Sequence, residues 1–332
     1  MKIIIPMAGI GKRLRPMTLS TPKPLIQIAG KPIVEWLVNS LKKISSEKIT
    51  DIGFIIGDFP IDIRPELVKI GKNMNANVHI FVQDEPLGTA HAISFASSLM
   101  NGPVIVAFAD TLFDTDVKFK SNTDVVIWTK NVENPEAYGV VVKDDKDFIN
   151  KFVEKPNQFV SDEAIIGIYY FQKSELLKDK LNFLLENNIV KGGEYQLTDA
   201  LQMLLDDGLK FESHPISVWL DCGNKELVIN TMKYVVKNFV DNSINSAGFV
   251  NCQIIEPVYI GKNVKLSNSI VGPNVTIEDN SNVERSIISN TMIFSNTHLN
   301  AVNVDNSIIG NYVKINSKSL NLALGDYNQI KI

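Results

Sequence analysis

The sequence has few cysteines, no long apolar run and no excess of one charge, and each absence excludes a class of protein. Its 332 residues include only Cys222 and Cys252 as cysteines, too few for a disulfide framework or a multi-cysteine metal site. The 33 lysines and arginines nearly balance 37 aspartates and glutamates, which leaves no domain-wide basic surface for a nucleic acid. Any anion-binding site must therefore be a local cluster of cations.

The sequence also lacks targeting and membrane signals. The apolar start Met1–Pro6 is interrupted by Gly9 and Gly11 and is too short for a signal-peptide core. No stretch approaches the ~20 apolar residues that a membrane span needs. Together with two cysteines that suit a reducing compartment, this predicts a cytoplasmic protein with neither a membrane nor a nucleic-acid partner.

From residue 1 to about 240, apolar strand-like runs alternate with helical patterns, which predicts an α/β domain over residues 1–240. Such alternation is typical of a Rossmann-like, mixed and mainly parallel sheet with helices on both faces. The later runs lie closer together, so part of the sheet is expected to be antiparallel. The expected strands are Lys2–Pro6, Ile52–Ile56, Val78–Gln83, Val104–Ala109, Val125–Thr129, Tyr138–Val142 and Ala164–Phe171. The expected helices are Ile33–Ile44, Glu66–Met74, Thr89–Leu99, Tyr195–Leu205 and Glu226–Phe239.

From about residue 250 the sequence pattern changes to a short repeat. Asparagine and serine become frequent, and an aliphatic or aromatic residue recurs every five or six positions between Ile260 and Ile315. Such a hexapeptide-type pattern predicts a short left-handed parallel β-helix over residues 250–332, in which stacked coils bury columns of apolar side chains. An irregular β-sandwich is the alternative. The segment Asp241–Gly248 is the expected linker.

A glycine-containing basic loop follows the first expected strand. Within Met7–Thr18, Gly9 and Gly11 let backbone N–H groups approach an anion, and Lys12, Arg13 and Arg15 add positive charge. The loop fits neither the dinucleotide-binding fingerprint, which needs a third glycine near position 14, nor the P-loop, which needs four residues between its glycines. A turn with a solvated basic face is the alternative to an anion site.

These residues resemble the signature of sugar-1-phosphate nucleotidyltransferases, which reads Gly-x-Gly-x-Arg-Leu-x-Pro-x-Thr followed by Pro-Lys-Pro. Six further motifs follow in the family's order: Gln83–Ala90, Phe108–Asp110, Tyr138–Val140, Val153–Pro156, Glu194–Asp199 and Trp219–Gly223. The chain departs from many members at Lys12, where they have threonine or serine. The resemblance implies attack of a sugar 1-phosphate oxygen on the α-phosphate of a nucleoside triphosphate, with release of pyrophosphate.

Two polyanions must meet in such a reaction. Two unit charges 4 Å apart repel by about 1 kcal/mol in water and by about 4 kcal/mol at an effective dielectric of 20. Positioning and charge neutralisation are therefore expected to dominate catalysis.

The resemblance assigns roles residue by residue. It implies catalytic roles for Arg13, Lys23 and Asp110, and Mg²⁺ ligation by Asp110 and Asp221. The implied nucleotide-binding residues are Ala8, Gly9, Gly11, Lys12, Arg13, Gln83, Gly88 and Thr89. The implied sugar-phosphate-binding residues are Gly139, Glu154, Lys155, Gly167 and Tyr169. Each has a structural alternative: Asp110 as a cap, Lys155 and Glu154 as a solvated pair, Asp221 as a turn residue.

Gln83 followed by Gly88 resembles the pyrimidine pocket of thymidylyl- and uridylyltransferases, because a side-chain amide offers a donor and an acceptor to a base edge. We therefore expect dTTP or UTP, with glucose 1-phosphate as sugar substrate. N-acetylglucosamine-1-phosphate uridylyl transfer and a non-catalytic sugar-nucleotide-binding regulator are the alternatives.

The repeat region, Glu194 and the histidines are given structural interpretations. The repeat region has a single histidine, His298, and is too short to favour acetyl transfer, so we expect it to pack on the catalytic domain and to associate subunits into a homo-oligomer. Glu194 is interpreted as a helix N-terminal acid rather than a ligand. The four histidines lack metal-ligand spacing and are interpreted as core or surface residues.

Overall fold

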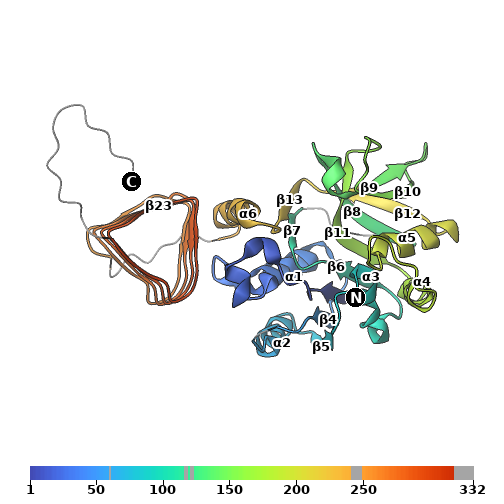
Figure 1. The fold of residues 1–332 in the computed structure, drawn as a ribbon, viewed down its shortest axis with the longest axis horizontal. Coiled ribbons are helices and arrows are strands. Elements are labelled where there is room, and N and C mark those ends of the chain that lie inside the picture. The colour runs from blue at the N-terminus through green and yellow to red at the C-terminus, as the bar shows by residue number, and fades with distance from the viewer. Residues whose placement is uncertain (60, 116–118, 120–122, 241–248, 318–332) are drawn as a thin grey trace. The chain divides into compact units, whose positions relative to one another are not determined.

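The computed structural model describes residues 1–332 except 60, 116–118, 120–122, 241–248 and 318–332, so the expected linker Asp241–Gly248 lies outside the described residues. The chain divides into two compact units (Figure 1). The first comprises Met1–Ile26 and Lys31–Val228, and the second comprises Gln27–Gly30 and Ile229–Ile332.

The first unit is built around a mixed sheet with the strand order β10-β9-β11-β6-β1-β4-β5, to which β8 and β12 add beyond β11. Its strands are β1 (Lys2–Pro6), β4 (Asp51–Ile56), β5 (Asn77–Val82), β6 (Val104–Ala107), β8 (Val125–Asn131), β9 (Gly139–Lys143), β10 (Ile149–Glu154), β11 (Glu163–Phe171) and β12 (Phe211–Pro215). Strands β6, β1, β4 and β5 run parallel, whereas β11 is antiparallel to β6, β8 and β9. The expected mixed, mainly parallel sheet is confirmed.

Helices pack against this sheet, because the apolar residues of each helix recur on one side and are buried there. In α1 (Ile33–Ile44), the buried Leu37 and Leu41 follow the helical period. The other helices of this unit are α2 (Arg64–Asn73), α3 (Thr89–Ser94), α4 (Ser174–Glu186) and α5 (Leu197–Asp206), with 3₁₀ turns at Lys12–Leu14, Met17–Leu19, Lys23–Leu25, Ser97–Leu99 and Pro135–Ala137. Helix α6 (Lys225–Asn238) begins in the first unit and continues into the second. The single helix expected over Thr89–Leu99 is wrong, because the chain leaves α-helical geometry at the buried Ala96.

A two-stranded antiparallel ribbon stands beside the main sheet and matters for the site. It pairs β7 (Thr111–Asp114) with β13 (Val218–Asp221), and Asp221 lies opposite Thr111. Because β7 starts directly after Asp110, the pairing brings the carboxylates of Asp110 and Asp221 to the same end of the ribbon. Two short strands, β2 (Gln27–Ile28) and β3 (Lys31–Pro32), precede α1.

The second unit contains the expected left-handed parallel β-helix, whose triangular cross-section is visible in Figure 1. Three four-stranded parallel sheets form its sides. They consist of β14 (Gln253–Ile254), β17 (Ile270–Val271), β20 (Ile287–Ser289) and β23 (Asn303–Asp305); β15 (Val258–Ile260), β18 (Val275–Ile277), β21 (Thr291–Ile293) and β24 (Ile308–Ile309); and β16 (Lys265–Ser267), β19 (Asn282–Glu284), β22 (His298–Asn300) and β25 (Lys314–Asn316). Stacked aliphatic residues such as Leu266, Val283 and Leu299 fill its interior.

Asparagines shape the turns of the β-helix. Asn274, Asn280, Asn290 and Asn296 have positive φ values between 44° and 61°, which asparagine tolerates better than most residues. Ile315, which was expected to continue the interior column, is exposed at the last described coil.

Among the helices that the structure describes, none has both the length and the apolar character that crossing a membrane requires. Neither Cys222 nor Cys252 forms a disulfide.

Candidate active site

The basic loop after β1 folds back on itself around Gly11. Gly11 adopts a left-handed conformation (φ 68°), and its carbonyl oxygen accepts hydrogen bonds from the Leu14 N–H (3.0 Å) and the Thr18 hydroxyl (2.9 Å). A Cβ at Gly11 would lie 3.1 Å from the Cβ of Lys23 and the Cγ2 of Thr18. The loop therefore lies directly against Lys23, while the side chains of Lys12 and Arg13 are exposed.

Lys23 and Asp110 form the central ion pair of the site. The Nζ atom of Lys23 lies 2.8 Å from Oδ2 of Asp110, and the lysine side chain is 13% exposed against 40% for the aspartate. Asp110 follows the buried strand β6 and precedes β7, so the strands fix its backbone while its carboxylate faces solvent. Carboxyl ends of parallel strands are the usual ligand sites of open α/β sheets.

Asp221 adds a second carboxylate to this pair. Burial, followed by the negative charge of Asp110, raises the pKa of Asp221, while the Gly223 N–H and the cations Lys23 and Arg13 oppose the rise. A Cβ at Gly223 would lie 3.0 Å from Asp221 Oδ1 and 3.5 Å from a guanidinium nitrogen of Arg13. Arg13, Lys23, Asp110 and Asp221 are therefore electrostatic neighbours, although they come from four separate segments.

The donor set fits a magnesium ion. Asp110 and Asp221 supply two hard carboxylate groups, and Mg²⁺ takes one or two carboxylates with waters and substrate phosphates completing its shell. The raised pKa of Asp221 next to Asp110 is the mark of two negative charges that a divalent cation would neutralise. No set of three or more His, Cys, Asp or Glu side chains able to hold a metal occurs within the described part of the chain.

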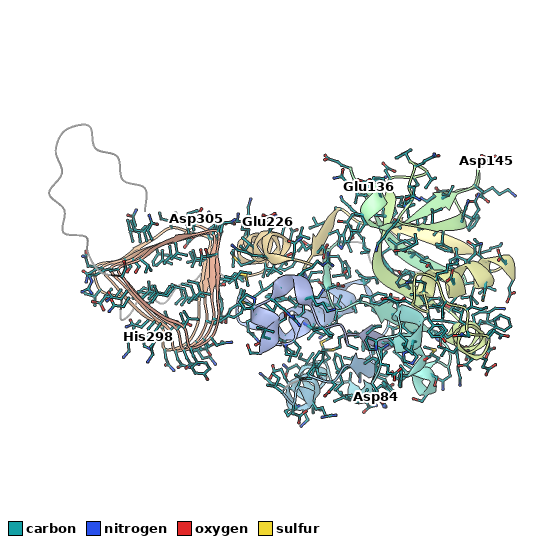
Figure 2. The ribbon with its side chains drawn as sticks, viewed as in Figure 1. Asp84, Glu136, Asp145, Glu226, His298 and Asp305 are labelled. Atoms are coloured by element: carbon teal, nitrogen blue, oxygen red, sulfur yellow. The ribbon has the colours of Figure 1, made fainter. Side chains whose placement is uncertain are left out.

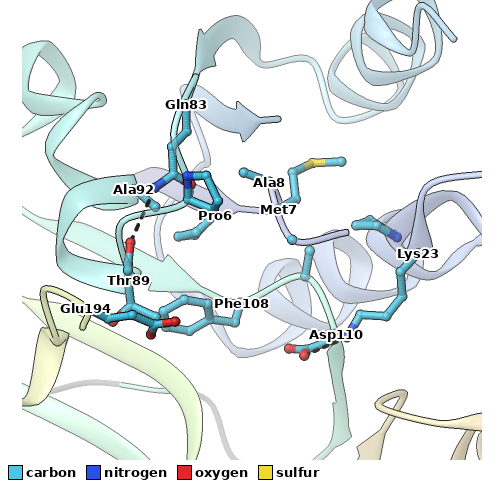
Figure 3. Close-up of a pocket in the computed structure, with 15 residues that line it drawn as sticks. Pro6, Met7, Ala8, Lys23, Gln83, Thr89, Ala92, Phe108, Asp110 and Glu194 are labelled. Atoms are coloured by element: carbon cyan, nitrogen blue, oxygen red, sulfur yellow. Dashed lines mark hydrogen bonds and ion pairs between the residues drawn. The ribbon is translucent and has the colours of Figure 1, made fainter. Parts of the chain in front are cut away.

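Beside the ion pair lies a pocket of about 260 Å³ (Figure 3). Seven of the residues expected at the site line it: Ala8, Gly9, Lys23, Gln83, Gly88, Thr89 and Asp110. Gly11, Lys12, Arg13 and Asp221 are not among its lining residues. The pocket wall also carries Phe108, so it combines a polar edge with an apolar floor, as small-ligand sites usually do.

The loop that carries Gln83 and Gly88 is fastened to the segment before α5. A Cβ at Gly88 (φ 118°) would lie 2.5 Å from the carbonyl oxygen of Tyr195, so only glycine fits there. The Thr89 hydroxyl accepts a hydrogen bond from the Leu197 N–H (2.9 Å), which gives Thr89 a structural task at the start of α5. This fastening also places Glu194 on the pocket wall.

The residues expected to bind the sugar phosphate form a second group next to Phe108. Gly139 pairs with Glu154 across strands β9 and β10, and a Cβ at Gly139 would lie 2.8 Å from Glu154 Oε2. The buried Tyr169 packs edge-on against Phe108 at 6.3 Å, and burial together with the Glu154 charge raises its pKa. Phe108 thus connects this group to the nucleotide-side pocket.

The two remaining sugar-side residues occupy the ends of that group. Gly167 (φ 84°) accepts a hydrogen bond from the Phe108 N–H through its carbonyl oxygen (3.0 Å). Lys155 follows β10, is exposed, and donates its backbone N–H to the Tyr138 carbonyl (3.0 Å). The Lys155 side chain is not among the pocket-lining residues.

Three residues at the site escaped the sequence interpretation. Glu194 was expected to be a helix N-terminal acid, but α5 begins at Leu197 and Glu194 lines the pocket instead. His91 contacts the Gln83 amide at 3.0 Å. Burial and the Asp221 charge raise the pKa of Tyr138, and Arg13 lowers it, which places the Tyr138 hydroxyl near the charged cluster. The quoted motifs contain Glu194 and Tyr138 but gave neither a role at the site, and no motif includes His91.

Comparison with known proteins decides the family. The model of the family described as Nucleotidyl transferase matches residues 2–238. The chain belongs to the nucleotidyl transferase family. The resemblance to sugar-1-phosphate nucleotidyltransferases drawn from the loop, together with the hexapeptide-repeat β-helix that follows it, is thereby confirmed.

Several curated nucleotidyltransferases resemble this chain, some of them over its full length. The low-salt glycan biosynthesis nucleotidyltransferase Agl11 of Haloferax volcanii is 28% identical, covering 100% of both chains. A glucose-1-phosphate thymidylyltransferase of Streptomyces antibioticus is 27% identical, covering 100% of this chain and 99% of the relative. The bifunctional protein GlmU of Methanocaldococcus jannaschii is 32% identical over 71% of this chain and 54% of its own length.

Among solved structures, one of a protein from Bacillus anthracis, described as a candidate glucose-1-phosphate thymidylyltransferase in complex with sucrose, shares the nucleotidyltransferase fold. The TM-score is 0.61 at 24% identity, and the match covers 72% of this chain and 96% of that one. At this identity the likeness shows the fold alone.

Proposed function

We propose that the protein transfers a nucleotidyl group from dTTP or UTP to a sugar 1-phosphate, with glucose 1-phosphate as the preferred acceptor. The observation that carries the proposal is the gathering of Arg13, Lys23, Asp110 and Asp221 beside the pocket that Gln83 lines. Relatives named glucose-1-phosphate thymidylyltransferase, similar over their full length, support this choice of substrates.

In the proposed reaction an anionic oxygen of the sugar phosphate attacks the α-phosphorus of the triphosphate. A new P–O bond forms, the bond between the α-phosphorus and the bridging oxygen breaks, and pyrophosphate leaves with that electron pair. The nucleophile is already ionised, so no general base is needed. The work of the protein is to hold two polyanions in line and to offset their charge.

Each charged residue then has a distinct task. Arg13, exposed on the loop, contacts the triphosphate and offsets charge on the leaving group. Lys23 is held within 2.8 Å of Asp110, which directs its ammonium group towards the transferred phosphate rather than to bulk solvent. Asp110 and Asp221 would hold Mg²⁺, which when bound supplies further neutralisation of the phosphate oxygens.

The sugar phosphate is assigned to the group around Phe108. Glu154 accepts hydrogen bonds from sugar hydroxyls, and the absence of a side chain at Gly139 leaves room for its carboxylate, because a Cβ there would lie 2.8 Å from Glu154 Oε2. Lys155 follows Glu154 directly, and we assign its ammonium group to the phosphate of the sugar. Gly167 and the buried Tyr169 form the wall behind the sugar.

A pyrophosphate-release assay tests the proposal. Purified protein with Mg²⁺ is incubated with each of dTTP, UTP, CTP, ATP and GTP against glucose 1-phosphate, N-acetylglucosamine 1-phosphate and mannose 1-phosphate. We expect the fastest turnover with dTTP or UTP and glucose 1-phosphate. Absence of turnover with every pair would contradict the catalytic proposal.

The same panel separates the two alternatives. Preference for UTP with N-acetylglucosamine 1-phosphate is the alternative that the relatives named bifunctional protein GlmU favour. Binding of a nucleotide sugar without turnover would indicate a regulator. Acetyl transfer has little support, because the repeat region is short and contains a single histidine, His298, which lies exposed on β22 (Figure 2). The homo-oligomer stays a prediction that sedimentation analysis measures.

A further inference from the structure

The amide of Gln83 is held by two hydrogen-bond acceptors. Gln83 follows β5 and is 6% exposed, and its backbone N–H donates to the Ile56 carbonyl (2.8 Å). Its Nε2 atom donates to the Gly88 carbonyl oxygen (3.4 Å) and faces Nδ1 of His91 (3.0 Å). The dashed line from Gln83 in Figure 3 marks the bond from Nε2 to the Gly88 carbonyl oxygen. Both hydrogens of the amide nitrogen are therefore directed towards the protein.

His91 is itself held firmly enough to act as one of these acceptors. It lies on α3, where its ring packs edge-on against Phe95 at 4.9 Å and lies 6.4 Å from the ring of Tyr195. The Ser94 hydroxyl donates to the His91 carbonyl (2.7 Å). An imidazole nitrogen accepts a hydrogen bond only in the neutral ring with the proton on the other nitrogen. With the Gln83 amide nitrogen turned towards His91, Nδ1 is therefore the acceptor of this contact.

The oxygen atom of the Gln83 amide, Oε1, is left available to a ligand. No hydrogen bond to Gln83 Oε1 is found within the part of the chain that the structure describes, and Gln83 lines the pocket. With its nitrogen engaged by His91 and Gly88, the amide presents its oxygen, a pure acceptor, to a ligand. A turned amide would bring Oε1 against the Gly88 carbonyl oxygen, which can only accept a hydrogen bond, and this contact is unfavourable.

We propose that His91 is the positioning residue that sets the nucleobase class, by fixing the Gln83 amide so that Oε1 faces the base. An acceptor selects a base with a ring N–H, which is N3–H of uracil or thymine and N1–H of guanine. It disfavours cytosine and adenine, whose corresponding ring nitrogens are acceptors. The inference rests on the proposed function, because it assumes that a nucleotide base enters this pocket.

Substitution of His91 tests the inference through selectivity rather than rate. His91→Leu removes the acceptor, and His91→Gln supplies either a donor or an acceptor; in both variants the amide is free to turn. We expect the ratio of kcat/KM for UTP over CTP to fall at least tenfold, because CTP gains while UTP loses. His91→Lys offers only donors, and we expect it to shift preference furthest towards CTP and ATP.

His79→Gln is the matched control. His79 lies on the same strand β5 and pairs with Asp51 (3.0 Å) away from the pocket, so its replacement should leave the UTP to CTP ratio unchanged. Thermal denaturation of each variant checks folding. A uniform loss of rate with all triphosphates would indicate a purely structural role for His91 and would overturn the inference, as would an unchanged ratio in all three His91 variants.

Nucleotide binding separates this inference from the proposed function. The shift in melting temperature caused by UTP or CTP, without sugar phosphate, reports binding to the folded protein. If the wild-type protein prefers UTP in this measurement and His91→Leu loses that preference, the inference stands even if no sugar phosphate is turned over. If wild-type binding does not distinguish UTP from CTP, the inference fails whatever the turnover shows.

Discussion

The two compact units of this chain differ in whether their key residues repeat along the sequence. In the β-helix, equivalent residues recur after 16 or 17 positions, so that Val271, Ile288 and Val304 align on successive strands of one sheet. In the α/β unit, the charged residues of the site come from single positions in unrelated segments, as Arg13, Lys23 and Asp221 do. The β-helix is therefore built by a repeated sequence pattern, whereas the site of the α/β unit is built by residues in the loops and at the ends of strands.

The difference teaches where a substitution should act. A β-helix residue makes the same contacts as its neighbours one coil away, so replacing it changes mainly local stability. The site residues lie in loops that the sheet holds in place, and their replacement should change mainly the reaction. The predictions that follow test this division, beginning with the largest expected effect.

Loss of the central ion pair should give the largest effect. We expect Asp110→Ala to lower kcat/KM by about 10²–10³-fold, because it leaves Lys23 without the partner that holds it and removes a carboxylate from beside Asp221. Arg13→Ala should lower the rate by a similar factor. Initial-rate measurements of pyrophosphate release check both variants.

The control for that prediction is an ion pair of the same chemistry away from the pocket. Lys69 and Glu66 lie 3.2 Å apart on α2, and exposed pairs contribute about 0–1 kcal/mol to stability. Lys69→Ala should therefore leave both the rate and the melting temperature nearly unchanged. Near-normal activity of Asp110→Ala would show that the site is misplaced.

Much of the division into an α/β unit with a site and a repetitive β-helix can be predicted from the sequence. The strand Lys2–Pro6 and the helix Ile33–Ile44 are found at the expected bounds, because each has a clear apolar period and a proline or glycine nearby to limit it. The repeat predicted the β-helix for the same reason. The nucleotide-side residues follow strand ends, which the alternation of elements already indicates.

Other parts of the site depend on tertiary pairing that no local pattern encodes. Asp221 reaches Asp110 only because β13 pairs with β7, and these strands are far apart in sequence. Glu194 reaches the pocket through the backbone contacts of Tyr195 with Leu87 and Ala90. The contact of His91 with Gln83 has no local signal in the sequence, because Gln83 follows β5 and His91 lies on α3, and the sequence does not fix the path of the loop between them.

Within the β-helix, two adjacent isoleucines should respond very differently to truncation. Ile288 is fully buried in the interior column, whereas Ile287 is 48% exposed. We expect Ile288→Ala to lower the free energy of unfolding of the β-helix by about 2–5 kcal/mol, the usual cost of a core cavity. Ile287→Ala should cost about 0.5 kcal/mol or less. Native-state hydrogen exchange of the β-helix strands measures both, and equal losses would contradict the assigned register.

Glu278 should make the stability of the second unit depend on pH. Burial raises the pKa of Glu278 to about 7. The Gly30 N–H, which donates a hydrogen bond to Oε1 of Glu278 (3.1 Å) within this unit, partly opposes this rise. The folded chain therefore keeps a proton that the unfolded chain, with a pKa near 4.5, has released. The contribution of Glu278 to the free energy of unfolding should be fully present below about pH 4.5. It should be lost as the pH rises through 7, which lowers the free energy of unfolding by up to about 3 kcal/mol.

Glu278→Gln isolates this contribution, because it keeps an acceptor for Gly30 but cannot ionise. Denaturant unfolding at pH 5 and pH 8 should show a larger loss of stability with rising pH in the wild-type protein than in the variant. Effects of other titrating groups, such as Asp305, cancel in that comparison. An identical pH dependence in both proteins would show that the carboxyl of Glu278 is not protonated in the folded state.

The smallest expected effect concerns a turn of the β-helix. Asn290 has a φ of 44°, accepts a hydrogen bond from Asn274 (3.0 Å) and donates one to Asp305 (2.8 Å). Asn290→Ala should lower the free energy of unfolding by about 2 kcal/mol, because it loses both bonds and adopts a left-handed conformation that alanine disfavours. Asn290→Gly loses the same bonds but accepts the backbone, so it should cost about 1 kcal/mol. Equal losses in the two variants would mean that the side-chain ladder, and not the backbone conformation, selects asparagine at these turns; a larger loss in alanine assigns that role to the backbone.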